Sequence, residues 1–209
     1  MIAIVDYEAG NLTSVAAALR SLGVQATITS EPAVIAAAER LVFPGVGAAG
    51  SAMRNLRRLG LAEPLRQAVA AGKPFLGICL GFQILFEHSA EDGGVDLLGV
   101  FRGRVVRFAD GMVEGGMGPL KVPQMGWNLA AFRGDHPVWH GLPADSEFYF
   151  VHSYYPEPEP ADVCATTIYG KTFASGVARG NVVAFQFHPE KSGRPGLQLL
   201  RNFCAWSPA

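Results

Sequence analysis

Short strand-like runs alternate with longer amphipathic segments through the first half of the chain. The runs lie at residues 2–5, 24–29, 41–43 and 74–78. The amphipathic segments, each of which we expect to be a helix, cover residues 13–22, 32–39, 49–59, 62–71 and 80–88. Thr13 fits the first helix as its N-cap, and Gly23, Gly60 and Gly72 follow helices as terminating residues. This alternation predicts an α/β fold with a doubly wound, mostly parallel sheet.

The second half of the chain has short runs rich in valine and aromatic residues, separated by glycine and proline. These runs cover residues 104–108, 148–153, 166–173 and 182–187. We expect them to form antiparallel strands at one edge of the parallel sheet. A closing helix is expected over residues 194–206, and the glycine-rich segment 110–119 is expected to be a surface loop.

The length and composition fit one domain over residues 1–209. Hydrophobic residues make up 49% of the chain and charged residues 17%, a balance that suits a parallel sheet covered on both faces. The net charge of −1 gives no reason to expect a nucleic-acid or membrane partner. Arg102, Arg104 and Arg107 gather locally, and we interpret them as one solvated face of a strand.

Three cysteines lie far apart in the sequence, at Cys79, Cys164 and Cys204. Their odd number and wide spacing argue against a disulfide framework and indicate a reducing compartment. The apolar residues 1–5 have no basic flank, so we expect a buried strand there and not a signal peptide. No apolar stretch approaches the ~20 residues that cross a bilayer, and a cytoplasmic location is expected.

One of these cysteines lies in a setting that is typical of a nucleophile. Cys79 stands between the expected strand 74–78 and the expected helix 80–88, with Gly77 and Gly81 on either side. Glycines relieve the crowding of a sharp strand-to-helix turn. Such a turn presents the sulfur at the carboxyl edge of a sheet and over a helix N-terminus, which favours a thiolate. A lone cysteine after a strand is more often a core residue, so further groups are needed to favour catalysis.

His188 and Glu190 supply the base and the carboxylate that a catalytic cysteine requires. His188 precedes Pro189, which favours extended backbone, and side chains two residues apart then point to the same side. The carboxylate can hold the imidazole in one tautomer and stabilise its protonated form. A surface turn is the alternative interpretation, and a zinc site lacks a fourth ligand. The sequence thus predicts a Cys–His–Glu triad with no metal or other cofactor.

An anionic intermediate on Cys79 would require hydrogen-bond donors. The backbone N–H of Leu80, directly after the nucleophile, is one candidate. The loop 44–47, Pro-Gly-Val-Gly, could bring a second N–H close, because glycine permits close approach and reorientation of a peptide. An ordinary strand-to-helix turn is the alternative for this loop.

These motifs resemble the class I, or triad, glutamine amidotransferases, in which a glutamine, here Gln83, follows the elbow. Longer segments resemble one branch of that family, the glutaminase subunits of imidazole glycerol phosphate synthases. They are residues 6–12, 44–47, 121–128, 148–155 and 188–193. The resemblance extends from the first strand to the last helix and implies a flavodoxin-like fold with antiparallel edge strands.

The resemblance implies that the chain hydrolyses glutamine to glutamate and ammonia. Cys79 would attack the side-chain amide, His188 would protonate the departing ammonia, and Glu190 would orient His188. Water would then hydrolyse a γ-glutamyl thioester. The other implied site residues are the oxyanion donors Leu80 and Gly47 or Val46, and the glutamine-binding residues Gln83, Ser153 and Tyr154.

The resemblance also implies a partner, a (β/α)₈-barrel cyclase subunit that forms a heterodimer with the chain. Ammonia would pass to this subunit, which makes imidazole glycerol phosphate and aminoimidazole carboxamide ribonucleotide in histidine biosynthesis. We expect docking through Asn11, Met125, Trp127 and Lys191, with Trp127 as the anchor and a core position as its alternative. Gln124 stands where many members have histidine, and we expect it to tune the partner contact.

The loop 44–47 is further expected to act as a two-state gate, whose N–H turns toward the active site when the partner binds its substrate. Other functions stay open at this point. The chain could be a stand-alone γ-glutamyl hydrolase, the amidotransferase subunit of another synthase, or a regulatory binding module that lacks activity.

Overall fold

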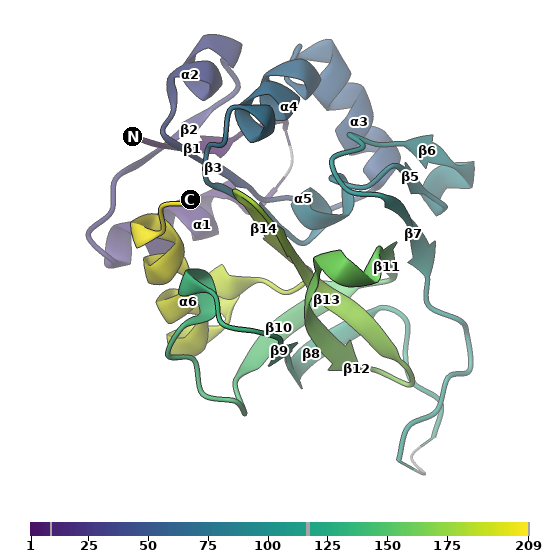
Figure 1. Cartoon of the computed structure of the whole chain (residues 1–209). Helices are drawn as coiled ribbons and strands as arrows, with labels where there is room; N and C mark the ends of the chain where they lie inside the picture. The colour runs from purple at the N-terminus through teal and green to yellow at the C-terminus, as the bar shows by residue number, and fades with distance from the viewer. Residues whose placement is uncertain (9, 116–117, 209) are drawn as a thin grey trace.

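Three parallel strands at the centre of the main sheet position the candidate site. The computed structural model describes residues 1–8, 10–115 and 118–208. Its largest sheet has eight strands in the order β2-β1-β3-β4-β14-β13-β12-β9 (Figure 1). These strands are β1 (Ile2–Val5), β2 (Ala26–Thr29), β3 (Arg40–Phe43), β4 (Phe75–Ile78), β9 (Ala131–Phe132), β12 (Val163–Ile168), β13 (Thr172–Arg179) and β14 (Val182–Phe185).

The direction of the strands divides this sheet into two parts. Strands β2, β1, β3, β4 and β14 run parallel to one another, and β13, β12 and β9 continue the sheet with antiparallel pairing. The expected mostly parallel α/β sheet with antiparallel edge strands is therefore confirmed. Because β3, β4 and β14 are parallel neighbours, the loops that follow them all emerge at the same edge of the sheet.

Side chains of the central strands alternate between two hydrophobic cores. Ala3 and Val5 of β1 lie in one core, and Ile2 and Ile4 lie in the other. The same alternation continues along the neighbouring strands, because successive side chains of a strand point to opposite faces. Both faces of the sheet are buried, which accounts for the uninterrupted hydrophobic runs in the sequence.

Helices cover both faces of the sheet. Helices α1 (Leu12–Ser21) and α6 (Gly193–Ala205) contribute to one core and lie together on one side, purple and yellow in Figure 1. Helices α2 (Pro32–Ala37), α3 (Ala49–Arg58) and α4 (Ala62–Ala70) contribute to the other core, on the opposite side. This arrangement is the doubly wound layering that the sequence pattern predicts.

Two smaller sheets complete the fold. One pairs β8 (Gln124–Leu129) with β10 (Glu147–His152), and the other has the order β11-β7-β5-β6. The strands of the second are β5 (His88–Ser89), β6 (Val95–Asp96), β7 (Gly103–Arg107) and β11 (Tyr154–Pro158). Short 3₁₀ helices cover Glu91–Gly93, Pro137–Trp139, Pro160–Asp162 and Pro189–Lys191.

The helix expected over residues 80–88 is much shorter than the sequence pattern suggests. Helix α5 covers only Leu80–Gln83. The next carbonyl groups, at residues 84–86, accept hydrogen bonds from backbone N–H groups of residues 98–101, at 2.7–3.0 Å. This returning segment takes the carbonyl groups that a longer helix would use, and the chain continues into β5.

Two other expectations were wrong in detail. The run 166–173 is not one strand, because Gly170, with φ +68°, lies in the turn between β12 and β13. Thr13 does not cap the first helix, which begins at Leu12 after Asn11, whose φ of 75° is left-handed. The expected closing helix is confirmed as α6.

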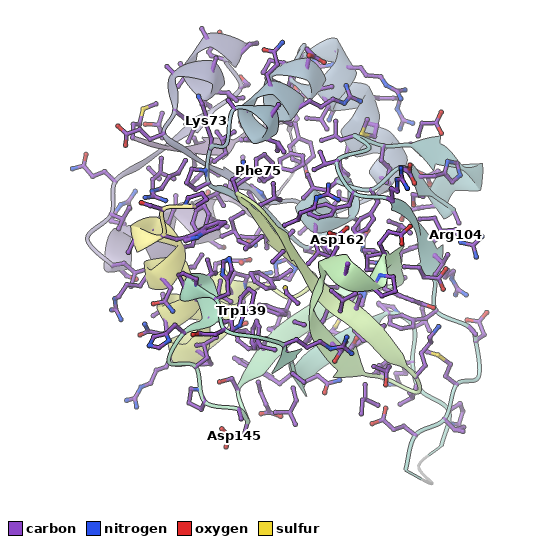
Figure 2. The ribbon with its side chains drawn as sticks, in the orientation of Figure 1. Lys73, Phe75, Arg104, Trp139, Asp145 and Asp162 are labelled. Carbon is purple, nitrogen blue, oxygen red and sulfur yellow. The ribbon has the colours of Figure 1, made fainter. Side chains whose placement is uncertain are left out.

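Aromatic side chains fill much of the hydrophobic core that contains Cys79. Phe185 and Phe187 stack with their ring centroids 5.0 Å apart, and Phe148 stacks on Phe187 at 4.1 Å. Figure 2 shows how densely side chains fill the interior, with Phe75 buried in the other core and the exposed Arg104 at the periphery. These rings pack the end of β14 against its neighbours.

The glycine-rich segment 110–119 contains no helix or strand among its described residues, and residues 116 and 117 lie outside the described part of the chain. In the same described part, no helix is long and apolar enough to cross a membrane.

Candidate active site

The backbone at Cys79 adopts a conformation that residues with a side chain rarely take. Cys79 directly follows β4 and has φ 55° and ψ −109°. A conformation of this kind costs on the order of 1–3 kcal/mol and persists only where its surroundings enforce it. Added to Gly81, a Cβ would lie 1.8 Å from the carbonyl oxygen of Phe43, and added to Gly77 it would lie 2.9 Å from Ala184. The two glycines therefore permit the close packing that enforces this turn.

His188 and Glu190 form the predicted pair beside this turn. His188 Nδ1 lies 2.8 Å from Glu190 Oε1, and both side chains are almost completely buried. The same carboxylate oxygen accepts a hydrogen bond from the side-chain amide of Asn11. Since a carboxylate only accepts, Nδ1 carries the proton, and Nε2 is left to accept one. Among the described residues, Nε2 has no hydrogen-bond partner.

The charge of Cys79 is coupled to the protonation of His188. Burial alone would lower the pKa of His188, but the negative charge and hydrogen-bonding capacity of Cys79, followed by those of Glu190, outweigh it and raise this pKa to about 10. A negative charge at Cys79 therefore favours a proton on both ring nitrogens of His188.

Two further groups contact the sulfur of Cys79. Its thiol lies 3.9 Å from the carbonyl oxygen of Val151, and Gln186 Nε2 lies 3.7 Å from Sγ. Within the described residues, no three or more His, Cys, Asp or Glu side chains are grouped as they would be around a metal ion.

A cavity of about 320 Å³ opens in front of Cys79. Its wall brings together all of the predicted oxyanion and glutamine-binding residues. The lining residues are Val46, Gly47, Cys79, Leu80, Gln83, Glu91, Pro123, Val151, His152, Ser153 and Tyr154. Gln83 is held there by its Nε2, which donates to the carbonyl of Tyr154 at 2.8 Å and to Gln186 Oε1 at 3.0 Å.

The loop 44–47 reaches the cavity with one of its carbonyls turned toward Leu80. The N–H of Leu80 donates to the carbonyl oxygen of Gly45 at 3.3 Å. Gly45 is tightly surrounded, since a Cβ added there would lie 1.8 Å from the hydroxyl of Tyr7. Gly47 has φ +102°, which favours glycine. One of the two predicted oxyanion donors is therefore occupied by the protein itself in this conformation.

The expected role of Gln124 is wrong, because its side chain faces the interior. Gln124 is buried, and its Oε1 lies 2.9 Å from His152 Nε2, while His152 Nδ1 lies 2.8 Å from the carbonyl of Tyr154. Burial lowers the pKa of His152 to about 4, so its ring is neutral and carries one proton. The Tyr154 carbonyl only accepts, so the proton of His152 lies on Nδ1 and Nε2 is an acceptor. The Gln124 amide is therefore assigned in the reversed orientation, with its NH₂ and not its oxygen toward Nε2.

The predicted docking residues divide between the surface and the site. Met125 and Trp127 alternate with inward-facing residues along β8 and are 65% and 54% exposed, so the core alternative for Trp127 is wrong. Leu129, which the motif analysis passed over, continues this row and is 48% exposed. Lys191 lies nearby, with Nζ 5.9 Å from the ring centroid of Tyr149. Asn11 differs from these residues, because its amide is bound to Glu190.

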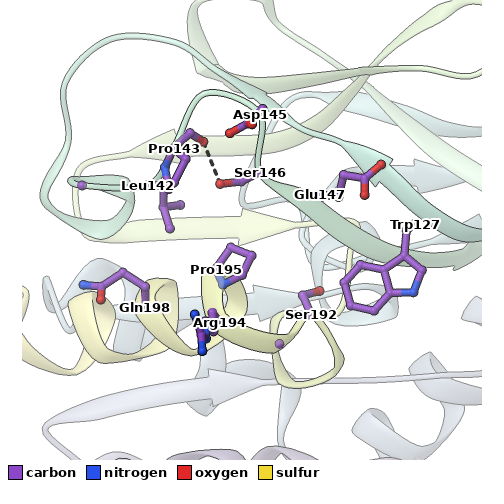
Figure 3. Close-up of a pocket in the computed structure, with 12 residues that line it drawn as sticks. Trp127, Leu142, Pro143, Asp145, Ser146, Glu147, Ser192, Arg194, Pro195 and Gln198 are labelled. Atoms are coloured by element: carbon purple, nitrogen blue, oxygen red, sulfur yellow. Dashed lines mark hydrogen bonds between the residues drawn. The ribbon is translucent and has the colours of Figure 1, made fainter.

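A larger cavity, of about 580 Å³, lies beside the exposed row and away from Cys79. Figure 3 shows it between the N-terminal turn of α6, with Arg194 and Pro195, and the loop that carries Pro143 and Asp145. Trp127 closes one end of it, next to Ser192. The predicted triad does not line this cavity, so size alone does not identify the active site.

Comparison with known proteins agrees with this geometry. The sequence model of the family described as Glutamine amidotransferase class-I matches residues 3–206. A solved structure titled "Crystal structure of glutamine amidotransferase" superposes with a TM-score of 0.74 at 21% identity, covering 98% of each chain. Another, of PurLQS from Thermotoga maritima, superposes with a TM-score of 0.72 at 17% identity, covering 98% of this chain and 97% of that one. The chain belongs to the class-I glutamine amidotransferase family.

More similar relatives narrow the assignment. A protein of Methylococcus capsulatus named imidazole glycerol phosphate synthase subunit HisH is 53% identical over 99% of this chain and 97% of its own length. Proteins of the same name from Aromatoleum aromaticum and Pseudomonas putida are 53% and 49% identical, covering 99% and 98% of this chain and 99% and 97% of their own lengths. Within the family, this chain belongs to the HisH subunits of imidazole glycerol phosphate synthase.

The neutral His152 makes stability depend on pH. The pKa of His152 falls from 6.5 to about 4 on folding, so the unfolded chain binds its proton first as the pH decreases. The free energy of unfolding is therefore unaffected by His152 above about pH 6.5, and it falls by about 3 kcal/mol as the pH decreases from there to pH 4.

The substitution His152→Asn tests this dependence. Denaturant titrations between pH 6.5 and pH 4 are expected to show a smaller loss of the free energy of unfolding in His152→Asn than in the natural chain. The exposed His140→Asn is the control, and equal losses in all three proteins would contradict the assignment.

Proposed function

We propose that the chain hydrolyses glutamine through a thioester on Cys79 and delivers the ammonia to a cyclase subunit. The chain is a glutamine amidotransferase subunit of the HisH type, which functions in histidine biosynthesis. The observation that carries the proposal is the strained turn at Cys79, together with His188, whose Nε2 has no hydrogen-bond partner among the described residues and whose pKa is raised by Cys79. No described residue competes for that nitrogen, so it is available to the reaction.

The first half of the reaction uses the thiolate and the imidazolium together. The proton of the Cys79 thiol moves to His188 Nε2, and the thiolate attacks the carboxamide carbon of glutamine. The carbonyl π electrons move to oxygen and form an oxyanion. When this intermediate collapses, His188 Nε2 gives its proton to the leaving nitrogen, the C–N bond breaks, and ammonia and a γ-glutamyl thioester result.

The second half regenerates the cysteine. His188 Nε2, now neutral, removes a proton from water as the water oxygen attacks the thioester carbon. Collapse breaks the C–S bond, glutamate leaves, and the thiolate and imidazolium return. Glu190 supports both halves, because its hydrogen bond at 2.8 Å keeps the Nδ1 proton in place and stabilises the imidazolium.

Glutamine is bound at the wall of the 320 Å³ cavity. Both hydrogen bonds recorded for Gln83 Nε2 are made to the protein, so its carbonyl oxygen is the part of this amide that accepts a donor from glutamine. The backbone of Ser153 and Tyr154 lies across the same cavity and supplies the remaining polar contacts. His152 fixes this segment through the carbonyl of Tyr154.

The loop 44–47 controls this chemistry as a gate. In the conformation described above, the Leu80 N–H is directed at Gly45 and not at the position of an oxyanion. Rotation of the peptide between Gly45 and Val46 would release Leu80 and turn the N–H of Val46 into the site, which places two donors on the oxyanion. We infer that docking of a cyclase that holds its phosphorylated substrate favours the rotated state.

The exposed face of β8 is the docking surface for the cyclase. Met125, Trp127 and Leu129 form one apolar row, and Tyr149 packs against Trp127 with ring centroids 6.1 Å apart. A patch of this kind on a polar surface is typical of a protein interface. Lys191 follows the triad directly and lies at the edge of this patch. The two subunits form a heterodimer in the cytoplasm, with the ammonia protected from solvent.

Replacement of the nucleophile is expected to separate the glutamine-dependent activity of the synthase from its ammonium-dependent activity. In complex with a cyclase subunit, Cys79→Ala is expected to lose glutamine-dependent synthesis by more than about a thousandfold. Synthesis from added ammonium is expected to continue, since the cyclase does not use this sulfur. Cys204→Ala, which removes a thiol on α6, is the control and retains both activities. Survival of the glutamine-dependent reaction in Cys79→Ala would overturn the assignment.

Truncation of the anchor tests the docking surface. Trp127→Ala is expected to weaken binding of the cyclase subunit by roughly thirtyfold, because a central tryptophan of an interface contributes about 2 kcal/mol or more. Titration calorimetry measures the affinity. Ile28→Ala removes another exposed apolar side chain, on β2 at an edge of the eight-stranded sheet, and is expected to bind normally. Equal affinities for both variants would place the interface elsewhere.

A further inference from the structure

We propose that Gln186 is a catalytic residue, whose side-chain amide donates a hydrogen bond to the sulfur of Cys79 and stabilises the thiolate. The inference rests on the proposed function, in which Cys79 is the nucleophile. Gln186 Nε2 lies 3.7 Å from Sγ, within the range of an N–H···S hydrogen bond. No triad motif includes this residue, and only the fold places it beside the sulfur.

The backbone holds Gln186 next to Cys79. Both residues directly follow strands that are parallel neighbours, β14 and β4, and the N–H of Cys79 donates to the carbonyl of Phe185 at 2.8 Å. The N–H of Gln186 in turn donates to the carbonyl of Ser175 on β13, at 2.9 Å. Gln186 has no exposed surface, and a buried amide in such a position requires partners for its polar atoms.

The partners of Gln186 fix which end of its amide faces the sulfur. Its Oε1 accepts a hydrogen bond from Gln83 Nε2 at 3.0 Å. Gln83 is itself fixed, because the same nitrogen donates to the carbonyl of Tyr154 at 2.8 Å. A reversed Gln186 amide would set two NH₂ groups against each other and turn a carbonyl oxygen toward the thiolate. Both changes are unfavourable, so the NH₂ of Gln186 is held toward Sγ.

This contact stabilises the sulfur in its charged state more than in its neutral state. In the thiol state, the S–H can donate to the carbonyl of Val151, 3.9 Å away. When the proton moves to His188 Nε2, the sulfur becomes an acceptor, and the Gln186 amide is a donor already aimed at it. The amide is neutral and does not compete with His188 for the proton. It therefore increases the thiolate fraction without changing the path of the proton.

Alkylation of Cys79 measures this effect without glutamine or a partner subunit. Iodoacetamide reacts with the thiolate, and mass spectrometry of the peptide that contains Cys79 separates it from Cys164 and Cys204. In Gln186→Met, which keeps the length but lacks the donor, alkylation near neutral pH is expected to be about tenfold slower. Its pH–rate profile is expected to move upward by about one pH unit. Gln186→Glu, which has the same shape, is expected to be slower still, because its carboxylate repels the thiolate.

Matched variants distinguish this role from a structural one. Gln198→Met removes another glutamine amide, one on α6 that contacts Asn202 and not the sulfur, and its alkylation profile is expected to match that of the natural chain. In complex with the cyclase, Gln186→Met is expected to lower kcat for glutamine about tenfold with little change in KM. An unmoved profile in both Gln186 variants, or an equal shift in Gln198→Met, would overturn the proposal.

The two proposals fail in distinguishable ways. If the natural chain with its partner releases no glutamate while the Gln186 variants still slow alkylation, the proposed function fails and the sulfur contact stands. If Gln186→Met does not fold, as judged by circular dichroism, the alkylation rates of Gln186→Glu and the natural chain are compared instead. Slower alkylation of Gln186→Glu supports the proposal, and equal rates overturn it.

Discussion

The strained backbone at Cys79 is the constraint on which the rest of the site depends. Its φ of 55° is maintained by close packing on both sides, where Gly81 lies against the carbonyl of Phe43 and Gly77 against Ala184. These contacts come from the two strands that flank β4, so the parallel sheet itself fixes the direction of the sulfur. A larger residue at either glycine would compete with strand packing, and a relaxed turn would change the direction of the sulfur relative to the proposed base, His188.

Around this turn, buried polar groups are connected in a chain that leads away from the sulfur. Gln186 contacts Sγ, Gln83 joins Gln186 to the carbonyl of Tyr154, and His152 joins that carbonyl to Gln124. Because β8 alternates its side chains, Gln124 faces this chain, and the next residue on the strand faces solvent on the proposed docking surface. The fold thereby brings the proposed docking surface within one strand of the polar groups around the proposed nucleophile.

The sequence predicts the parts of the site that are encoded locally. The elbow around Cys79, the pair His188 and Glu190, and the loop 44–47 are short motifs, and the strand order brings all three to one sheet edge. The contacts of Gln124 and Gln186 could not be predicted in this way. They depend on which strands become neighbours and on which face of a strand a side chain occupies, and a shift of one residue in register reverses that face. The early end of α5 has the same origin, because a segment from elsewhere in the chain takes its carbonyl groups.

The central claim is that this chain is a glutaminase whose oxyanion site is completed by its partner. The most direct test measures glutamate release from glutamine by the purified chain, first alone and then with the cyclase subunit and its phosphorylated ligand. The account predicts slow release by the chain alone, because the Leu80 N–H is bound to Gly45, and an increase of at least about tenfold with the liganded partner. Equally rapid release in both conditions would contradict the gate and favour a free-standing hydrolase.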